Sequence, residues 1–387
     1  RNGGNISLSS KKRIKFIMEA MGVALCFPVK ESDNWKVAID LYSKWIDDPS
    51  LFGDVRKQNN YLRKIIKQLS SPFNFRNMKE NLSDNNDIFS SKAYPVLNIL
   101  LDCYERLLRK RAKEMEKKTF LLLFNILIGI CDSVQENKYA LLEKLKVNFY
   151  NLQKKITDIL FSTIYLYGIK DVSIWKRLIS FFQDWSSKPG IIEVWGEKII
   201  SIYSYICSTI MNLEKTKNPF EGGVFDSNNV ITLDLVSYYF QNTIMVINIQ
   251  TVANDPKLLN KISDFCESLI NISMESARKA SPFLTNRYPA SNFLRLFGSF
   301  LTLCPATVGI EHEEYISKCI DSILCLVSHF SHDGVEGFIP KLLAFVAQKI
   351  TPQSQLIIGS FLNRANELYE FNHVGITYYS EIGRASC

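Results

Sequence analysis

The sequence contains few of the residues that build tight turns or carry out acid–base chemistry. Among its 387 residues there are 17 Gly, 12 Pro and 4 His. The low Gly and Pro content disfavours folds made of many short strands joined by β-turns, and no convincing alternation of apolar and polar residues indicates a strand. Four histidines leave few general bases for catalysis near neutral pH. Hydrophobic residues make up 47% of the chain, which is ample for a core.

The sequence also lacks the short motifs of the common catalytic and nucleotide-binding sites. It has no GxxxxGK loop, no GxSxG turn and no GxGxxG after a strand. The segment EHEEY (311–315) is not a zinc-protease HExxH motif, because no second His follows four residues after His312. We therefore predict no catalytic residues, no cofactor and no enzymatic activity for this segment.

One helical segment near the C-terminal end of the sequence contains a cluster of metal-ligating residue types. Cys325, His329 and His332 lie at positions i, i+4 and i+7, so a single helix face could present all three to zinc. His312 or Cys319 could supply a fourth ligand, but none is evident from the sequence. Ordinary helix residues around a buried thiol explain the pattern better, and we predict no metal site.

Apolar residues recur with helical period along the sequence, and most breaks contain Pro or clusters of Ser, Asn and Asp. A single core does not grow much beyond a few hundred residues, so the length favours a chain of helical hairpins over one large bundle. We predict an all-α fold, a HEAT/armadillo-like α-solenoid of about fourteen helices. It is expected to be one elongated domain over 1–387, with loops near 77–92, 214–228 and 281–290. The expected helices span 10–26, 33–46, 54–70, 93–116, 119–135, 139–167, 171–186, 190–213, 229–249, 256–275, 290–303, 311–330, 335–350 and 353–370.

The cysteines and the longest apolar run indicate a cytoplasmic protein. Nine Cys occur, an odd number, and none forms a CxxC motif, so we expect reduced and mostly buried thiols. The run FLLLFNILIGI (120–130) is too short to cross a bilayer and is predicted to be a buried helix. No signal peptide is recognised, and because the sequence begins at Arg1 we expect a fragment of a longer protein.

Positive charge is concentrated in the first third of the chain. Residues 1–118 hold 23 of the 46 Lys and Arg but only 14 of the 39 Asp and Glu, a net of +9 against −2 for the remainder. The run RLLRKRAKEMEKK (106–118) is expected on one long helix, with Glu114 and Lys118 as an i, i+4 ion pair. It is either a solvated helix face or a docking surface for acidic proteins or lipid head groups, with peripheral membrane association. Nucleic acid is disfavoured, because no aromatic stacking platform accompanies the charge.

Two segments share an unusual spacing of tryptophan. DNWKVAIDLYSKWIDDP (33–49) and SIWKRLISFFQDWSSKP (173–189) both have Trp-Lys, a second Trp ten residues after the first, and Pro four residues later. On a helix both Trp residues fall on one apolar stripe, and the Pro ends the helix. We interpret this Trp frame as a packing device rather than an exposed aromatic patch. On that interpretation, Trp185→Ala should cost about 3–5 kcal/mol.

Several segments, in order, resemble the N-terminal helical region of Ral GTPase-activating protein subunits, most closely the non-catalytic beta subunit. They are MGVALCFPV (21–29) with VAIDLYSKWI (37–46), QNNYLRKIIKQLSSPFNFR (58–76), IWKRLISFFQDWSSKPGIIEVWGEKI (174–199), NFLRLFGSFL (292–301) and ISKCIDSILCLVSHFSHDGVEGFIPKLLAFV (316–346). Phe300 stands where the family pattern has Trp. The related tuberin family shares this architecture.

The resemblance implies a HEAT-like solenoid that precedes a GTPase-activating domain of the Rap/Ran type in the parent protein. In that family a C-terminal domain supplies a catalytic Asn, and no residue here matches it. The beta subunit assists a catalytic alpha subunit, so the implied partners are that subunit and, through the complex, a small GTPase of the Ras superfamily. The alternative is an unrelated HEAT-like adaptor or transport-receptor solenoid, which explains the fold but not the order of the segments.

Overall fold

The computed structural model describes residues 11–28, 31–48, 55–74, 89–136, 146–168, 170–210 and 233–248, with short pieces between 52 and 272. Within these residues the structure is helical and contains no strand. The chain groups into two compact units. Unit 1 comprises Arg1–Asp171 and Phe220–Val230, and unit 2 comprises Val172–Pro219 and Ile231–Cys387.

Within the described residues unit 1 contains six α-helices, and four of them both begin and end close to the predicted bounds. The helices are α1 (Lys11–Ala24), α2 (Ser32–Asp47), α3 (Val55–Leu69), α6 (Tyr94–Arg111), α7 (Lys117–Gln135) and α8 (Lys146–Tyr167). The predicted helix 93–116 ends early at Arg111, and the predicted helix 139–167 begins late at Lys146. Gly168, with φ 74°, follows the last residue of α8, a position where a side chain would be strained.

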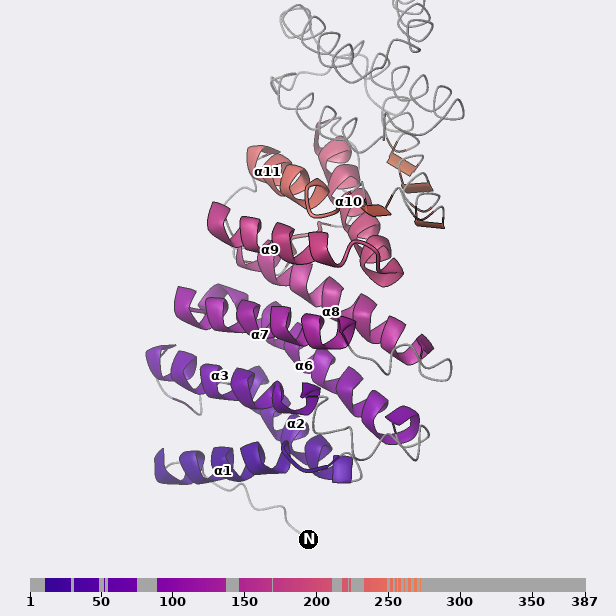
Figure 1. Ribbon diagram of the computed structural model, residues 1–387. Helices are drawn as coiled ribbons and strands as arrows, with labels where there is room; N and C mark the ends of the chain where they lie inside the picture. The colour runs from indigo at the N-terminus through magenta and orange to yellow at the C-terminus, as the bar shows by residue number, and fades with distance from the viewer. Residues whose placement is uncertain are drawn as a thin grey trace, which may run out of the picture. The chain divides into compact units, whose positions relative to one another are not determined.

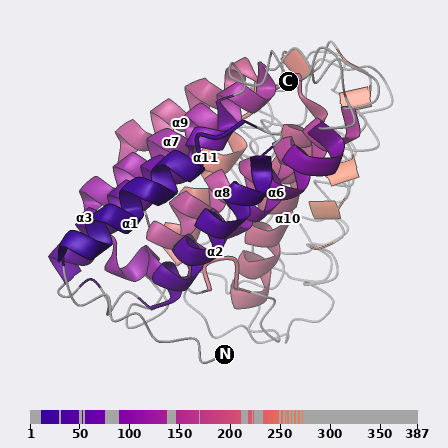
Figure 2. The same ribbon diagram turned by 90° about the horizontal axis from the view of Figure 1, so that it is seen from below.

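These helices stack in two layers. α1, α3 and α7 contact one another in sequence along one layer, and α2, α6 and α8 do so along the other. Figure 2 shows the two layers from the end of the stack. Contacts between α1 and α2 and between α7 and α8 join the layers as helical pairs. α3 and α6 lie between these pairs, and the Tyr104 hydroxyl of α6 donates to the Ile66 carbonyl of α3 at 3.0 Å. Helices stacked in two layers in this way are the arrangement of an α-solenoid, which confirms the predicted fold class.

Unit 2 contains α9 (Val172–Asp184), α10 (Pro189–Ile210) and α11 (Leu233–Ile244). Pro189 begins α10, where its missing N–H and fixed φ suit the first helical position. Buried Trp195 of α10 donates its indole N–H to the Thr243 carbonyl at 2.7 Å, which fastens α10 to α11. The predicted helices at 290–303, 311–330, 335–350 and 353–370 lie outside the described residues, as does most of 256–275. The helix count and the single elongated domain therefore stay predictions.

The core confirms three of the four tryptophans in the Trp frames as packing residues. Trp35 and Trp45 on α2 and Trp175 on α9 are buried. Trp35 also donates its indole N–H to the Phe27 carbonyl at 3.1 Å. Trp185 is different, because α9 ends at Asp184 and places Trp185 in the following turn, half-buried. The prediction that Trp185 lies on the buried helical stripe is wrong.

Candidate docking surface

The basic run 106–118 does not form one helix. α6 ends at Arg111, a short 3-10 turn spans Ala112–Glu114, and α7 begins at Lys117. Glu114 pairs with Arg111 at 2.9 Å, and among the described ion pairs it does not pair with Lys118. The predicted single basic helix and its Glu114–Lys118 pair are therefore wrong, because the chain turns between the two helices.

Arg111 is buried and holds the end of α2. Its Nε donates to the Ile46 carbonyl at 2.7 Å and its Nη2 to the Asp47 carbonyl at 2.8 Å. These carbonyls end a helix and have no intrahelical partner, so Arg111 satisfies them. Much of the remaining charge in the run is also paired. Arg106 meets Asp47 at 3.4 Å, and Arg109 meets Glu105 at 2.8 Å. The arginines of the basic run therefore mainly stabilise the fold and offer little free charge to a binding partner.

Asn59 of α3 fixes the turn between α6 and α7. The buried side chain donates to the Glu114 carbonyl at 3.0 Å and accepts from the Glu116 N–H at 2.9 Å. The two bonds satisfy a backbone donor and a backbone acceptor that no helix can satisfy at this point. The turn therefore holds the first turn of α7 against α3.

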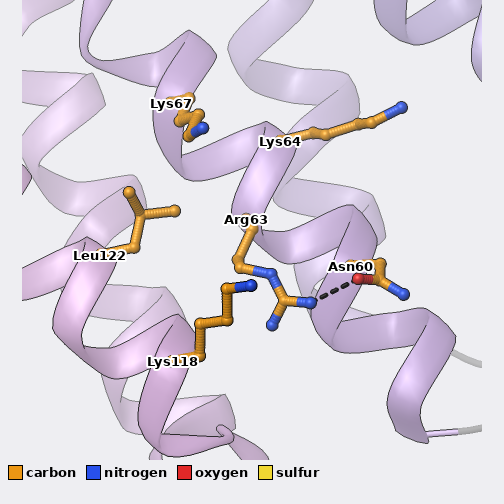
Figure 3. Close-up of a pocket in the computed structure, with 6 residues that line it drawn as sticks. All are labelled: Asn60, Arg63, Lys64, Lys67, Lys118 and Leu122. Carbon is orange, nitrogen blue, oxygen red and sulfur yellow. Dashed lines mark hydrogen bonds between the residues drawn. The ribbon is translucent and has the colours of Figure 1, made fainter.

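A basic pocket lies where α3 meets the first turns of α7 (Figure 3). Its volume is about 310 Å³. We call it the α3–α7 pocket. It is lined by Asn60, Arg63, Lys64, Lys67, Lys118 and Leu122. Figure 3 shows Arg63 and Lys118 pointing toward one another from the two helices, whereas the Lys64 side chain points away from Lys118 and Leu122. Four of the six residues are cations, so the pocket is suited to an anion.

The cations of the α3–α7 pocket differ in how they are held. Arg63 donates to Thr119 Oγ1 at 2.8 Å, to Glu116 Oε2 at 3.2 Å and to Asn60 Oδ1. Lys64, Lys67 and Lys118 are exposed, and none forms an ion pair in the part of the chain that the structure describes. Residues 55–69 contain five Lys or Arg and no Asp or Glu. The three lysines therefore project uncompensated charge around a fixed Arg63.

Sequence reasoning missed this pocket and selected a neighbouring run instead. Only Lys118 belongs to both. A signal was present in the sequence, since Arg63, Lys64 and Lys67 occupy i, i+1 and i+4 of a helix without acidic residues. What the sequence could not show is that α7 packs beside this face and brings Lys118 to it.

The buried thiols fit no catalytic role. Burial raises the pKa of the Cys103 thiol to about 11, and burial raises that of Cys131 to about 12. Both thiols therefore stay protonated near neutral pH and are poor nucleophiles. Cys207 is buried as well and Cys26 is exposed, so three of the four cysteines in the described residues are buried, as expected.

Cys325, His329, His332, His312 and Cys319 all lie outside the described residues. Within the described ranges no group of three His, Cys, Asp or Glu side chains could hold a metal ion. The prediction of no metal site stays a prediction.

Comparisons with known proteins find a similarity over part of the chain. No curated protein sequence matches it. One solved structure, a "circular tandem repeat protein with novel repeat topology and enhanced subunit contact surfaces", aligns over 94% of this chain and 89% of its own, with 16% identity and a TM-score of 0.30. That score is too low to support an argument.

A family model, the RALGAPB N-terminal domain, matches residues 93–213. The matched segment begins one residue before α6 and ends three residues after α10, so it takes in whole helices. The second Trp frame lies inside the match, and the first lies outside it. The resemblance stated from the sequence is confirmed for residues 93–213, which are similar to the RALGAPB N-terminal domain.

Proposed function

We propose that this chain is a non-catalytic scaffold region of a Ral/Rap-type GTPase-activating protein complex. Its role would be to support assembly with a catalytic subunit, and through that complex to regulate a small GTPase of the Ras superfamily. The observation that carries the proposal is the match of residues 93–213 to the RALGAPB N-terminal domain. An unrelated adaptor or transport-receptor solenoid would not account for that match.

The fold supports a scaffold role. In unit 1, helical pairs stack along one direction, which presents long surfaces to partners while each pair needs only its neighbours for stability. The match spans α6 to α10, so those helices are our first candidates for the surface that meets the catalytic subunit.

The proposal includes a cytoplasmic location and peripheral contact with membranes. α7 is long and apolar enough, by length and composition alone, to cross a bilayer. In this structure it instead packs against α3 and α8, with Phe120, Leu123 and Leu127 buried. We therefore assign α7 to the core of unit 1, and membrane contact would have to use the surface.

The scaffold role can be tested by GTP hydrolysis. The 387-residue chain, incubated with GTP-loaded Ral or Rap, should leave hydrolysis at its intrinsic rate. A catalytic Ral-type GTPase-activating subunit added to the same reaction serves as the positive control. Acceleration by the chain alone would contradict the non-catalytic assignment.

The partner can be tested separately by affinity capture. The immobilised chain should retain a purified catalytic Ral-type GTPase-activating subunit and should not retain a nuclear-import cargo. Retention of the cargo alone would instead support the adaptor or transport-receptor alternative.

A further inference from the structure

We propose that the α3–α7 pocket binds the phosphorylated headgroup of an anionic membrane lipid. This names the ligand class for the peripheral membrane contact proposed above and does not depend on assembly with a catalytic subunit. The starting observation is an exposed pocket with four cations, three of which form no ion pair within the described residues.

The pocket is large enough for a headgroup with more than one phosphate. Its volume of about 310 Å³ falls at the lower end of the roughly 300–1,000 Å³ that is typical of small-molecule sites. A phosphomonoester carries close to two negative charges at neutral pH. Two such groups carry about three to four negative charges, which the three positive charges of Lys64, Lys67 and Lys118 would largely balance.

The type of cation favours a lipid over a phosphorylated protein. Phosphorylated side chains are usually recognised by arginines that grip the phosphate with two parallel hydrogen bonds. Here the single Arg63 already donates to Asn60, Thr119 and Glu116. The cations without protein partners are lysines, which act as point charges and are typical of surfaces that meet anionic lipids.

The neighbouring helix adds charge and an exposed aromatic side chain. α1 contacts α3 in the same layer, where Gln68 donates to the Met18 carbonyl at 2.9 Å. α1 carries exposed Lys12, Arg13 and Lys15, and Phe16 is 71% exposed. Basic residues next to an exposed aromatic residue are the composition of helices that lie at a membrane interface.

The test uses vesicle co-sedimentation of the full 387-residue chain. Three vesicle types are compared: neutral phosphatidylcholine, phosphatidylcholine with phosphatidylserine, and phosphatidylcholine with a bisphosphorylated inositol lipid at the same total charge. We expect the chain to bind the inositol-lipid vesicles most tightly. Equal binding to both anionic vesicles would overturn the headgroup assignment while leaving peripheral association intact.

Two double variants with the same net charge locate the site. Lys67→Gln/Lys118→Gln neutralises the pocket, and Lys110→Gln/Lys176→Gln neutralises two exposed lysines on α6 and α9 that form no described ion pair. The pocket variant should lose about tenfold or more in affinity for inositol-lipid vesicles, and the control variant should keep its affinity.

Unchanged affinity in the pocket variant, or an equal loss in both variants, would overturn the proposal. Far-UV circular dichroism should show that both variants are folded. If the pocket variant loses helix, the experiment is repeated with Lys64→Gln/Lys118→Gln, which must show the same loss of affinity.

Competition identifies the source of the phosphate. The soluble bisphosphorylated inositol headgroup should displace the chain from vesicles, and a phosphoserine peptide of equal charge should not. If the peptide competes better than the headgroup, the pocket is a phosphopeptide site and the lipid proposal is wrong. If wild-type chain binds no vesicle but still captures the catalytic subunit, the membrane proposal fails and the scaffold role stands.

Discussion

The two Trp frames begin with the same spacing and end in different structures. In the first frame α2 continues through Trp45 to Asp47, and both Trp45 and Ile46 are buried. In the second frame α9 ends at Asp184, and Trp185 lies half-buried in a turn. The first Trp of each frame, Trp35 or Trp175, is buried in both. The shared spacing therefore fixes the start of the packing stripe but not its end.

The residues after the second Trp account for this difference. In the first frame Ile46 follows Trp45 and packs in the core, and Arg111 from α6 binds the last carbonyls of α2. In the second frame Ser186 follows Trp185. Its hydroxyl donates to the Phe182 carbonyl at 3.0 Å and accepts from the Asn248 N–H at 2.9 Å. A serine that binds the backbone in this way offers an alternative to another helical turn.

The largest effect is expected from truncating the buried Trp of the first frame. Trp45→Ala should reduce the free energy of unfolding of unit 1 by about 3–5 kcal/mol, as for other large aromatic side chains removed from a core. Trp45 lies 5.3 Å from Phe52 and 5.8 Å from Tyr42, measured between ring centroids, so its loss leaves a cavity among aromatic rings. Urea unfolding followed by far-UV circular dichroism measures the change. A loss of only about 1–2 kcal/mol, as expected for Trp185→Ala, would contradict the difference between the two frames.

Arg111 caps the C-terminal end of α2 by binding the Ile46 and Asp47 carbonyls. Without this cap the end of α2 should fray, so that the first frame would end in a turn as the second frame does. Arg111→Met keeps much of the apolar stem but leaves the Ile46 and Asp47 carbonyls without their side-chain donor. We expect a loss of about 2–3 kcal/mol, in the range for buried acceptors left unsatisfied. Hydrogen exchange of the Asp48 amide, which donates to the Lys44 carbonyl at 3.0 Å, should accelerate. Unchanged exchange there would mean that Ile46 alone extends the helix.

The second Trp of the second frame should matter less than the sequence predicts. Because Trp185 is half-buried and lies in a turn that can relax, we expect Trp185→Ala to cost about 1–2 kcal/mol, by the apolar area it still buries. The same urea experiment on unit 2 checks this value. A cost as large as that of Trp45→Ala would restore the original prediction for both frames.

The sequence predicted the elements well and the site poorly, for a physical reason. Helical periodicity and Pro positions placed α2 and α3 within one or two residues, because those signals are local. The end of α2 depends on Arg111, which lies 65 residues after Ile46. The α3–α7 pocket likewise depends on Lys118 meeting a helix more than fifty residues earlier. Local patterns predict helices, but pairing between distant helices decides which charges are buried, paired or left exposed.

The smallest effect is expected from replacing Lys188. This residue lies next to the turn that ends the second frame, whereas the first frame ends in a helix. Its Nζ lies 5.7 Å from the Trp185 ring, a cation–π contact in a partly exposed turn. Lys188→Gln should cost about 0.5 kcal/mol, the low end for such contacts. A double-mutant cycle with Trp185→Ala isolates the contact, since Lys188→Gln should have almost no effect once the ring is gone. If Lys188→Gln costs the same in both backgrounds, the contact between Lys188 and the Trp185 ring contributes nothing to stability.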